Sequence, residues 1–181
     1  MLTTAPTFDH LYLLLPESGD RPAATVIAAD QMPQPYHRLL VHTHHMTVTV
    51  EDFYGSPVDV KVLACRRNGD EYARKILLAL HEGGRVVQFG MVRIDLGVCP
   101  EPVRNAIVEG KTPLGRVLIQ HNVLRVVRPV EFFRAAPGPA MCDWFGLARP
   151  EPTYGRLGII YTDGKPAIRV AEILTPVRSN G

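Results

Sequence analysis

The strongest constraint on the fold is a two-residue hydrophobic period that recurs in separate runs of the chain. In residues 58–64, Val58, Val60 and Val62 alternate with more polar neighbours, and a similar run covers residues 72–80 after the turn sequence Arg-Arg-Asn-Gly-Asp. This is the period of a β-strand, whose successive side chains point to opposite faces. Further strand-like runs cover residues 85–96, 123–133, 155–162 and 167–175.

Helical signals fall between these strands rather than alternating strictly with them. Residues 34–53 predict two short helices, the second beginning near Met46, and residues 100–109 and 112–121 predict two more, with Gly110 placed to end the first of them. A Pro-, Gly- and Ala-rich stretch at residues 135–140 predicts a surface loop. We therefore expect an α+β fold with a six-stranded, mostly antiparallel sheet and helices covering an enclosed pocket.

The length indicates one domain, because 181 residues with 46% hydrophobic residues can bury one sizeable core. Residues 1–33 carry scattered Pro, Gly and Asp without a sustained period, apart from a short apolar patch at residues 11–15. We expect residues 1–33 to form an N-terminal arm, either extended or an early strand, and residues 34–181 to form the domain.

Composition limits the partners and the compartment. The 20 Lys and Arg nearly balance the 18 Asp and Glu, so no broad field favours nucleic acid. Three widely spaced cysteines fit neither a disulfide framework nor a paired metal site. With no apolar run of about 18 residues and no leader pattern at the start, we expect no membrane span and a cytoplasmic protein. Monomer and small homo-oligomer both remain open.

Three places combine polar chemistry with apolar surroundings. The first is Thr112-Pro113-Leu114-Gly115, where Thr112 is suited to cap a helix and Pro113 to open it, leaving the amides of Leu114 and Gly115 free at the positive end of the dipole. Such an end can bind a carboxylate or phosphate. An ordinary helix start after a tight turn is the alternative.

The second place is Arg74, which alternation puts on one face with Tyr72, Ile76, Leu78 and Leu80. A buried guanidinium needs an anion, and its fork suits a carboxylate. The alternative is that the opposite face, which is also fairly apolar, is the buried one and that Arg74 lies in solvent.

The third place is Glu172, which shares a face with Ile168, Val170 and Leu174 on the last predicted strand. A carboxylate in an apolar lining either pairs with a cation or has a raised pKa, and both properties suit a catalytic acid or base. The alternative is a structural ion pair within the sheet. Together the three places describe a pocket for a small dianion with a polar handle.

The order and spacing of these motifs resemble the chorismate pyruvate-lyase family. The likeness covers residues 34–176 and rests on six segments: Leu-Leu at 39–40 leading to Met-Thr at 46–47, Tyr-Ala-Arg-Lys-Ile-Leu-Leu at 72–78, Gly-Lys-Thr-Pro-Leu-Gly-Arg at 110–116, Tyr-Gly-Arg at 154–156, Gly-Lys-Pro at 164–166, and Ala-Glu-Ile-Leu-Thr-Pro at 171–176. The resemblance implies a lyase that converts chorismate to 4-hydroxybenzoate and pyruvate without a metal or organic cofactor. Tyr154, where the family has Trp, and Arg156, the one arginine left of an arginine-rich strand, depart from the family.

The resemblance also implies roles for individual residues. Arg74 would hold a substrate carboxylate, the Leu114 amide beside Gly115 would hold a carboxylate oxygen, Glu172 would contact the ring hydroxyl, and Met46 would cover the ring. We expect Arg74 and Glu172 to be catalytic, Met46, Leu114 and Gly115 to bind the substrate, and chorismate or a similar dianion to be that substrate.

Three other functions remain open. The chain could be a non-catalytic small-molecule-binding domain, since the same fold occurs as an effector-sensing domain of bacterial regulators; residues 1–33 look too short for the DNA-binding segment of those proteins. It could be a lyase for another chorismate-derived compound. The third is a metal site at His42, His44 and His45, near His37, although no carboxylate lies beside them before Glu51 and Asp52.

Overall fold

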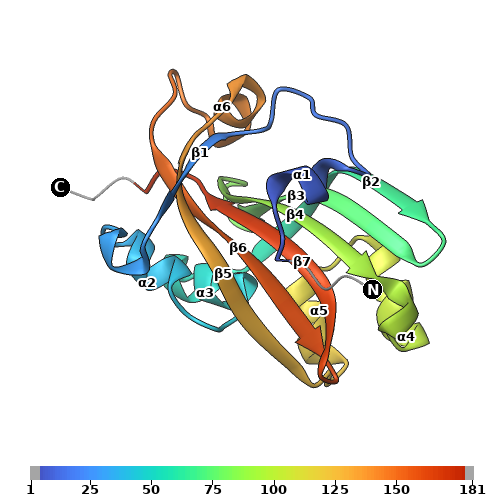
Figure 1. Cartoon of the computed structure of the whole chain (residues 1–181). Coiled ribbons are helices and arrows are strands. Elements are labelled where there is room, and N and C mark those ends of the chain that lie inside the picture. The colour runs from blue at the N-terminus through green and yellow to red at the C-terminus, as the bar shows by residue number, and fades with distance from the viewer. Residues whose placement is uncertain (1–4, 178–181) are drawn as a thin grey trace.

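The computed structural model describes residues 5–177, and its centre is one antiparallel sheet of seven strands rather than the six expected. The order across the sheet is β1-β5-β6-β7-β4-β3-β2 (Figure 1). The strands are β1 (Ala23–Ile27), β2 (Val58–Asn68), β3 (Glu71–Leu80), β4 (Val86–Asp95), β5 (Arg125–Ala136), β6 (Thr153–Thr162) and β7 (Lys165–Leu174).

The additional strand comes from the segment that the sequence assigned to the arm. β1 pairs with the end of β5, from Ala23 opposite Ala136 to Ile27 opposite Phe132. Its side chains are mostly exposed, which explains why no apolar alternation marked it. Residues 1–4 of the predicted arm and 178–181 of the predicted domain lie outside the described residues.

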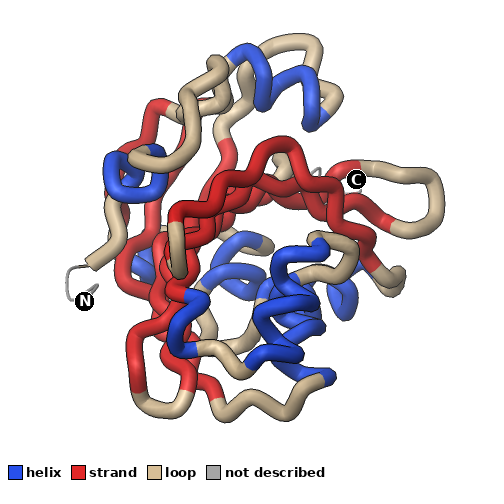
Figure 2. The backbone as a smooth tube through the Cα atoms, turned by 90° about the vertical axis from the view of Figure 1, so that its right-hand side faces the viewer, coloured by secondary structure: helices blue, strands red, loops and turns tan. Residues whose placement is uncertain are grey.

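Helices cover both faces of the sheet. On one face lie α2 (Tyr36–Leu40), α3 (Met46–Tyr54), α4 (Glu101–Glu109) and α5 (Leu114–Gln120), and Figure 2 shows the strands arching over a group of helices. On the other face lie α1 (Phe8–Tyr12) and α6 (Pro139–Phe145). Two short 3-10 turns, η1 (Ala29–Gln31) and η2 (Leu96–Val98), complete the elements. Both faces of β3 are therefore buried.

The second face is covered because a buried ion pair ties the N-terminal segment to the sheet. The Lys75 ammonium lies 2.7 Å from Asp20 Oδ2, and both side chains are almost fully buried. Lys75 also lies over the ring of Tyr12, 4.6 Å from its centroid. The predicted arm is thus packed against the sheet through the buried apolar side chains of Leu11 and Leu15 and through these charge and aromatic contacts.

Two local predictions were wrong and two were confirmed. Helix α5 begins at Leu114 and its capping position is Pro113, which has no side-chain acceptor, so Thr112 is not the cap. The stretch 135–140 is not a surface loop: β5 runs to Ala136 and α6 begins at Pro139. Gly110 does end α4 in the left-handed region, and Asp163 and Gly164 both have positive φ in the predicted hairpin turn.

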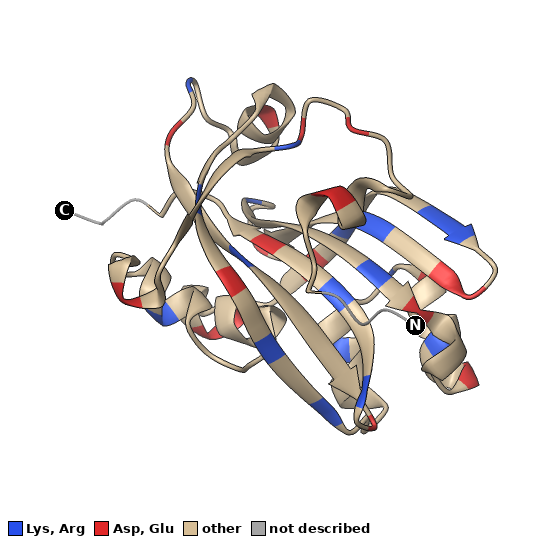
Figure 3. Cartoon of the chain, viewed as in Figure 1, with Lys and Arg blue, Asp and Glu red and all other residues tan. Residues whose placement is uncertain are grey.

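Charges of both signs are interspersed along the ribbon (Figure 3). In the part of the chain that the structure describes, no helix has both the length and the apolar character needed to span a membrane.

We expect Gly155→Ala to destabilise the fold, because β6 passes directly under an aromatic ring there. A Cβ at Gly155 would lie 2.5 Å from Phe133 Cζ and 2.6 Å from the Glu172 carbonyl oxygen, and the latter is backbone that cannot rotate away. The expected loss is about 3 kcal/mol of the free energy of unfolding, measured in urea. Gly158→Ala on the same strand, whose nearest atom would be 3.2 Å away, is the control and should lose about 1 kcal/mol or less.

Candidate functional site

An internal cavity lies between the sheet and the helices that begin at Met46 and Leu114. Its volume is about 50 Å³, and β3, β4 and β7 supply its floor. All five site residues proposed from the sequence line it: Met46, Arg74, Leu114, Gly115 and Glu172. The fold therefore brings residues up to 126 positions apart in the chain to the same cavity, as the resemblance implied. Their shared location does not by itself assign them a role.

Arg74 is the least compensated charge in the cavity wall. Its side chain is 1% exposed, and Nη1 donates a hydrogen bond to the Ile107 carbonyl oxygen at the end of α4, at 3.2 Å. Its Nε has no hydrogen-bond partner, and no carboxylate among residues 5–177 pairs with it. Burial lowers the pKa of the guanidinium, because the charge has lost water without gaining an anion.

Two cavity residues were not identified from the sequence. Gln88 on β4 is buried, and its Oε1 has no hydrogen-bond partner. Gly90, two positions along, pairs with both Ile76 and Glu172, and a Cβ there would lie 3.0 Å from Ile76 Cδ1. Because Gly90 has no side chain, it leaves space at the floor of the cavity. Gln88 could have been identified from the sequence as the one amide side chain in the apolar run of β4.

Glu172 forms an ion pair, which was the structural alternative considered for it. Its Oε2 accepts a hydrogen bond from Arg156 Nε at 2.6 Å, and Arg156 is its cross-strand neighbour on β6. The side chain of Arg156 is 1% exposed and that of Glu172 is 14% exposed. The negative charge of Glu172 is therefore already matched before any ligand arrives.

Arg156 also holds the loop between α2 and α3. Nη1 donates to the carbonyl oxygens of Leu40 at 3.0 Å and His42 at 2.9 Å, and Nη2 donates to that of His44 at 3.1 Å. A single buried guanidinium thus fastens residues 40–44 to the sheet. Sequence analysis identified Arg156 only as part of a motif and did not predict that it would hold this loop.

The histidine cluster organises the same loop. His42 Nε2 donates to the Leu39 carbonyl oxygen at 2.7 Å, while its Nδ1 accepts from the His44 amide at 3.1 Å. His45 Nε2 accepts from Arg125 Nε at 2.7 Å. Within residues 5–177, no group of three or more His, Cys, Asp or Glu side chains is arranged to hold a metal ion.

These contacts require neutral imidazoles. Burial, the larger cause, and the charges of neighbouring arginines together lower the pKa of both His42 and His45 to about 4; the arginine is Arg156 for His42, and Arg125 and Arg156 for His45. Both rings are therefore uncharged at neutral pH.

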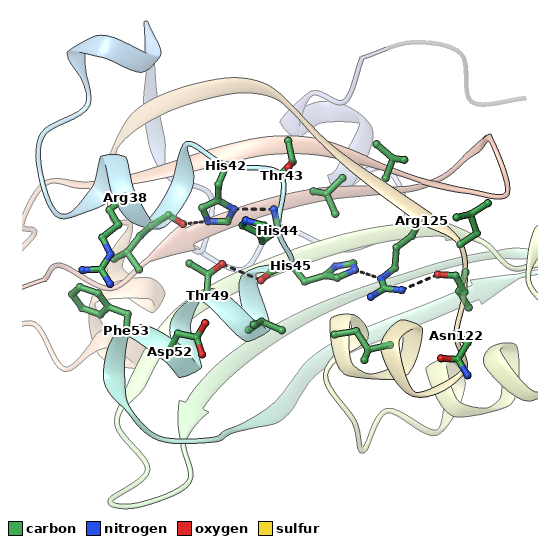
Figure 4. Close-up of a pocket in the computed structure, with 17 residues that line it drawn as sticks. Arg38, His42, Thr43, His44, His45, Thr49, Asp52, Phe53, Asn122 and Arg125 are labelled. Atoms are coloured by element: carbon green, nitrogen blue, oxygen red, sulfur yellow. Dashed lines mark hydrogen bonds between the residues drawn. The ribbon is translucent and has the colours of Figure 1, made fainter.

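A second, open groove of about 990 Å³ lies outside this loop. Its walls come from α2, α3, the loop at 41–45, the end of α5 and the start of β5 (Figure 4). Among the described residues, His45 is the one that lines both the groove and the internal cavity. Its imidazole is therefore part of the wall between the two spaces.

No family model and no curated protein matches the sequence. The structure is similar to PhnF from Mycobacterium smegmatis, with a TM-score of 0.56 and 10% identity over 78% of this chain and 71% of that chain. It is also similar to the effector domain of PhnF from the same organism, with a TM-score of 0.54 and 11% identity over 73% and 88% of the two chains. A GntR-family transcriptional regulator from Bacillus cereus has a TM-score of 0.46 and 14% identity over 68% and 96%.

These identities show a shared fold, and that fold corrects the expected function. The prediction of an enzyme is corrected: the structures that share this fold are PhnF and its effector domain, and neither is named as a lyase. The pairing of Glu172 with Arg156 agrees with this correction, since it occupies the carboxylate assigned to catalysis. The expected α+β fold with a mostly antiparallel sheet stands, with seven strands rather than six.

We expect Arg156→Lys to release the loop at 40–44. An ammonium cannot reproduce three parallel contacts with carbonyl oxygens and a fourth with Glu172, so the free energy of unfolding should fall by about 3 kcal/mol. Amide hydrogen exchange at residues 42–45 should accelerate more than in β2 and β3. Arg128→Lys, at an exposed position on β5, is the control. Unchanged exchange in the loop would show that other contacts hold it.

Stability should fall as the pH is lowered from about 6.5 to about 4. The folded-state pKa values of His42 and His45 lie below the ordinary value, so in this window the unfolded chain binds more protons than the folded chain. The loss should reach roughly 1–2 kcal/mol for each histidine, allowing for their partial exposure, and should level off below pH 4.

Urea titrations across this pH range would measure the effect. The double variant His42→Gln, His45→Gln should show a shallower dependence, and His121→Gln, at an exposed position, should behave as the parent. Identical pH profiles for all three proteins would place the titrating groups elsewhere.

Proposed function

We propose that this chain is a non-catalytic small-molecule-binding domain whose internal cavity takes a compact organic anion. The observation that carries the proposal is the buried, uncompensated guanidinium of Arg74 in the cavity wall. A buried cation without an anion costs free energy, and a ligand carboxylate would recover it through charge-assisted hydrogen bonds. The shared fold with an effector domain supports the same type of function.

The remaining lining supports a ligand with an apolar body. Ile76, Leu78 and Val92 face the cavity from the sheet, and Met46 and Leu114 face it from the helices. The unpartnered Gln88 Oε1 would accept a hydrogen bond from a hydroxyl or amine on the ligand. We therefore propose a carboxylate on an apolar or aromatic frame that also carries one donor.

Binding in this cavity requires the walls to move. A volume of about 50 Å³ is well below the several hundred Å³ of most ligand pockets. Met46 is the most adaptable wall residue, because its unbranched thioether fits irregular spaces. A ligand would thus select a more open form of α3 against the sheet, which is the property that a sensing domain needs.

In this proposal the carboxylate of Glu172 does not repel the ligand. Because Arg156 neutralises its charge, a ligand carboxylate at Arg74 would not meet an unpaired like charge across the cavity. The cavity then carries a net positive charge from Arg74. This charge balance favours an anion over a neutral compound of the same shape.

Benzoate and its uncharged isostere benzamide provide a matched test. Benzoate should raise the melting temperature in a concentration-dependent way, and benzamide should raise it at least tenfold less effectively. Arg74→Met should abolish the benzoate effect while melting at the same temperature as the parent or higher, since it removes an uncompensated buried charge. Arg128→Gln should keep the benzoate effect.

The absence of catalysis is tested separately. Incubation with chorismate should release pyruvate no faster than a protein-free blank, in the parent and in Arg74→Met alike. Protein-dependent pyruvate release that is lost in Arg74→Met would overturn the proposal of a binding domain. Equal stabilisation of the parent and Arg74→Met by benzoate would place the ligand outside the cavity.

A further inference from the structure

We propose that the open groove beside α3 and β5 is a second ligand site, distinct from the internal cavity, that binds an amphipathic organic acid with its acidic group on Arg125. The proposal rests on a fixed cation, on exposed apolar side chains around it and on a concave shape of suitable size. It does not depend on what the internal cavity binds.

The cation is held in place before any ligand arrives. Arg125 Nε donates to His45 Nε2 at 2.7 Å, and Nη1 donates to the Val123 carbonyl oxygen at 2.9 Å. Both partners are uncharged, and within residues 5–177 no carboxylate pairs with Arg125. The guanidinium is therefore preorganised and carries an unmatched charge at the surface of the groove.

Large apolar side chains that are usually buried are exposed in the same groove as this cation. Ile119 at the end of α5, Leu124 before β5 and Val126 on β5 are 37%, 71% and 52% exposed, and all three line the groove. Several exposed large apolar residues in one concave place mark a binding site more strongly than isolated ones do. They suit the hydrocarbon or aromatic body of a ligand.

The charges along the groove give the ligand an orientation. Asp52 is the one carboxylate among the described lining residues, and it lies with Arg38 and Phe53 at the end away from Arg125 (Figure 4). Arg38 balances the charge of Asp52 at that end, so the unmatched positive charge of the groove lies at the Arg125 end and attracts an acidic group there. The volume of about 990 Å³ is at the upper end for small-molecule sites, which fits a ligand larger than a single ring.

The groove is separate from the cavity because the His45 side chain lies between them. The Cβ and Cγ of His45 pack close to Gly115, where an added Cβ would lie 3.0 and 3.2 Å from them. Arg74 lines only the cavity, and Arg125 lines only the groove. Substitutions at these two arginines therefore report on the two spaces independently.

Two fluorescent probes with nearly the same body test the proposal. 8-Anilinonaphthalene-1-sulfonate carries an acidic group, and N-phenyl-1-naphthylamine is its uncharged counterpart. We expect the sulfonate to bind the folded parent saturably at one site. Arg125→Gln should weaken sulfonate binding by about tenfold or more and leave binding of the uncharged probe within about twofold.

Matched variants control for folding and for charge in general. Arg128→Gln, three positions along the same strand, and Arg74→Met should both keep sulfonate binding within about twofold. Val126→Asp, at an exposed position that leaves Arg125 intact, should weaken sulfonate binding by a similar factor to Arg125→Gln, because it places a like charge in the groove. Melting temperatures of all variants establish that each is folded.

The site of binding is read from backbone amide chemical shifts. Addition of the sulfonate should shift Thr43, Asn122 and Val126, which line the groove, more than Gly90 and Ala171, which line the cavity. Equal affinity of Arg125→Gln and Arg128→Gln would overturn the proposal, as would shifts confined to the cavity. Concentration-dependent dimerisation that buries the groove and excludes the probe would also overturn it.

Discussion

The buried guanidinium of Arg156 is the contact on which the arrangement of the internal cavity and the open groove depends. It joins a carboxylate on β7 to three backbone carbonyl oxygens in the loop before α3, so the helical layer and the sheet are connected by one side chain. The carbonyl oxygens would otherwise need water or other donors. Without this connection, Met46 would not be held over the sheet, and His45 would not separate the groove from the cavity.

The same contact explains why a lyase-like set of residues does not imply a lyase. Arg74, Glu172, Met46 and Leu114 converge as the resemblance implied, but convergence concerns position, whereas catalysis depends on charge state and on room for a substrate. Glu172 is matched by Arg156, and the space beside Arg74 is small in the described structure.

Alternation was enough to predict six of the seven strands, because local period determines them, whereas the convergence of Arg74 with Glu172 was implied by the family resemblance and not by spacing. β1, α1 and α6 were not predicted, since they are short or exposed and are positioned by distant contacts such as Lys75 with Asp20. The pairing of Arg156 with the loop joins residues more than 110 positions apart, so no sequence pattern indicates it. In the sequence Gln88 is an ordinary strand residue, and only the structure shows that its unpartnered side-chain oxygen belongs to a residue lining the cavity.

Because His45 lines both spaces, compounds that displace its imidazole would link the occupancies of the two spaces, whereas compounds that leave it in place would bind independently. Any compound that binds better with the imidazole displaced, on either side, changes the affinity of the other side by some factor, and that factor is the same in both directions. The reciprocity follows from a closed free-energy cycle and holds whichever compound binds first. Displacement of one half-buried ring, which accepts one hydrogen bond from Arg125, would then be sufficient to let a compound at the surface alter what the interior retains.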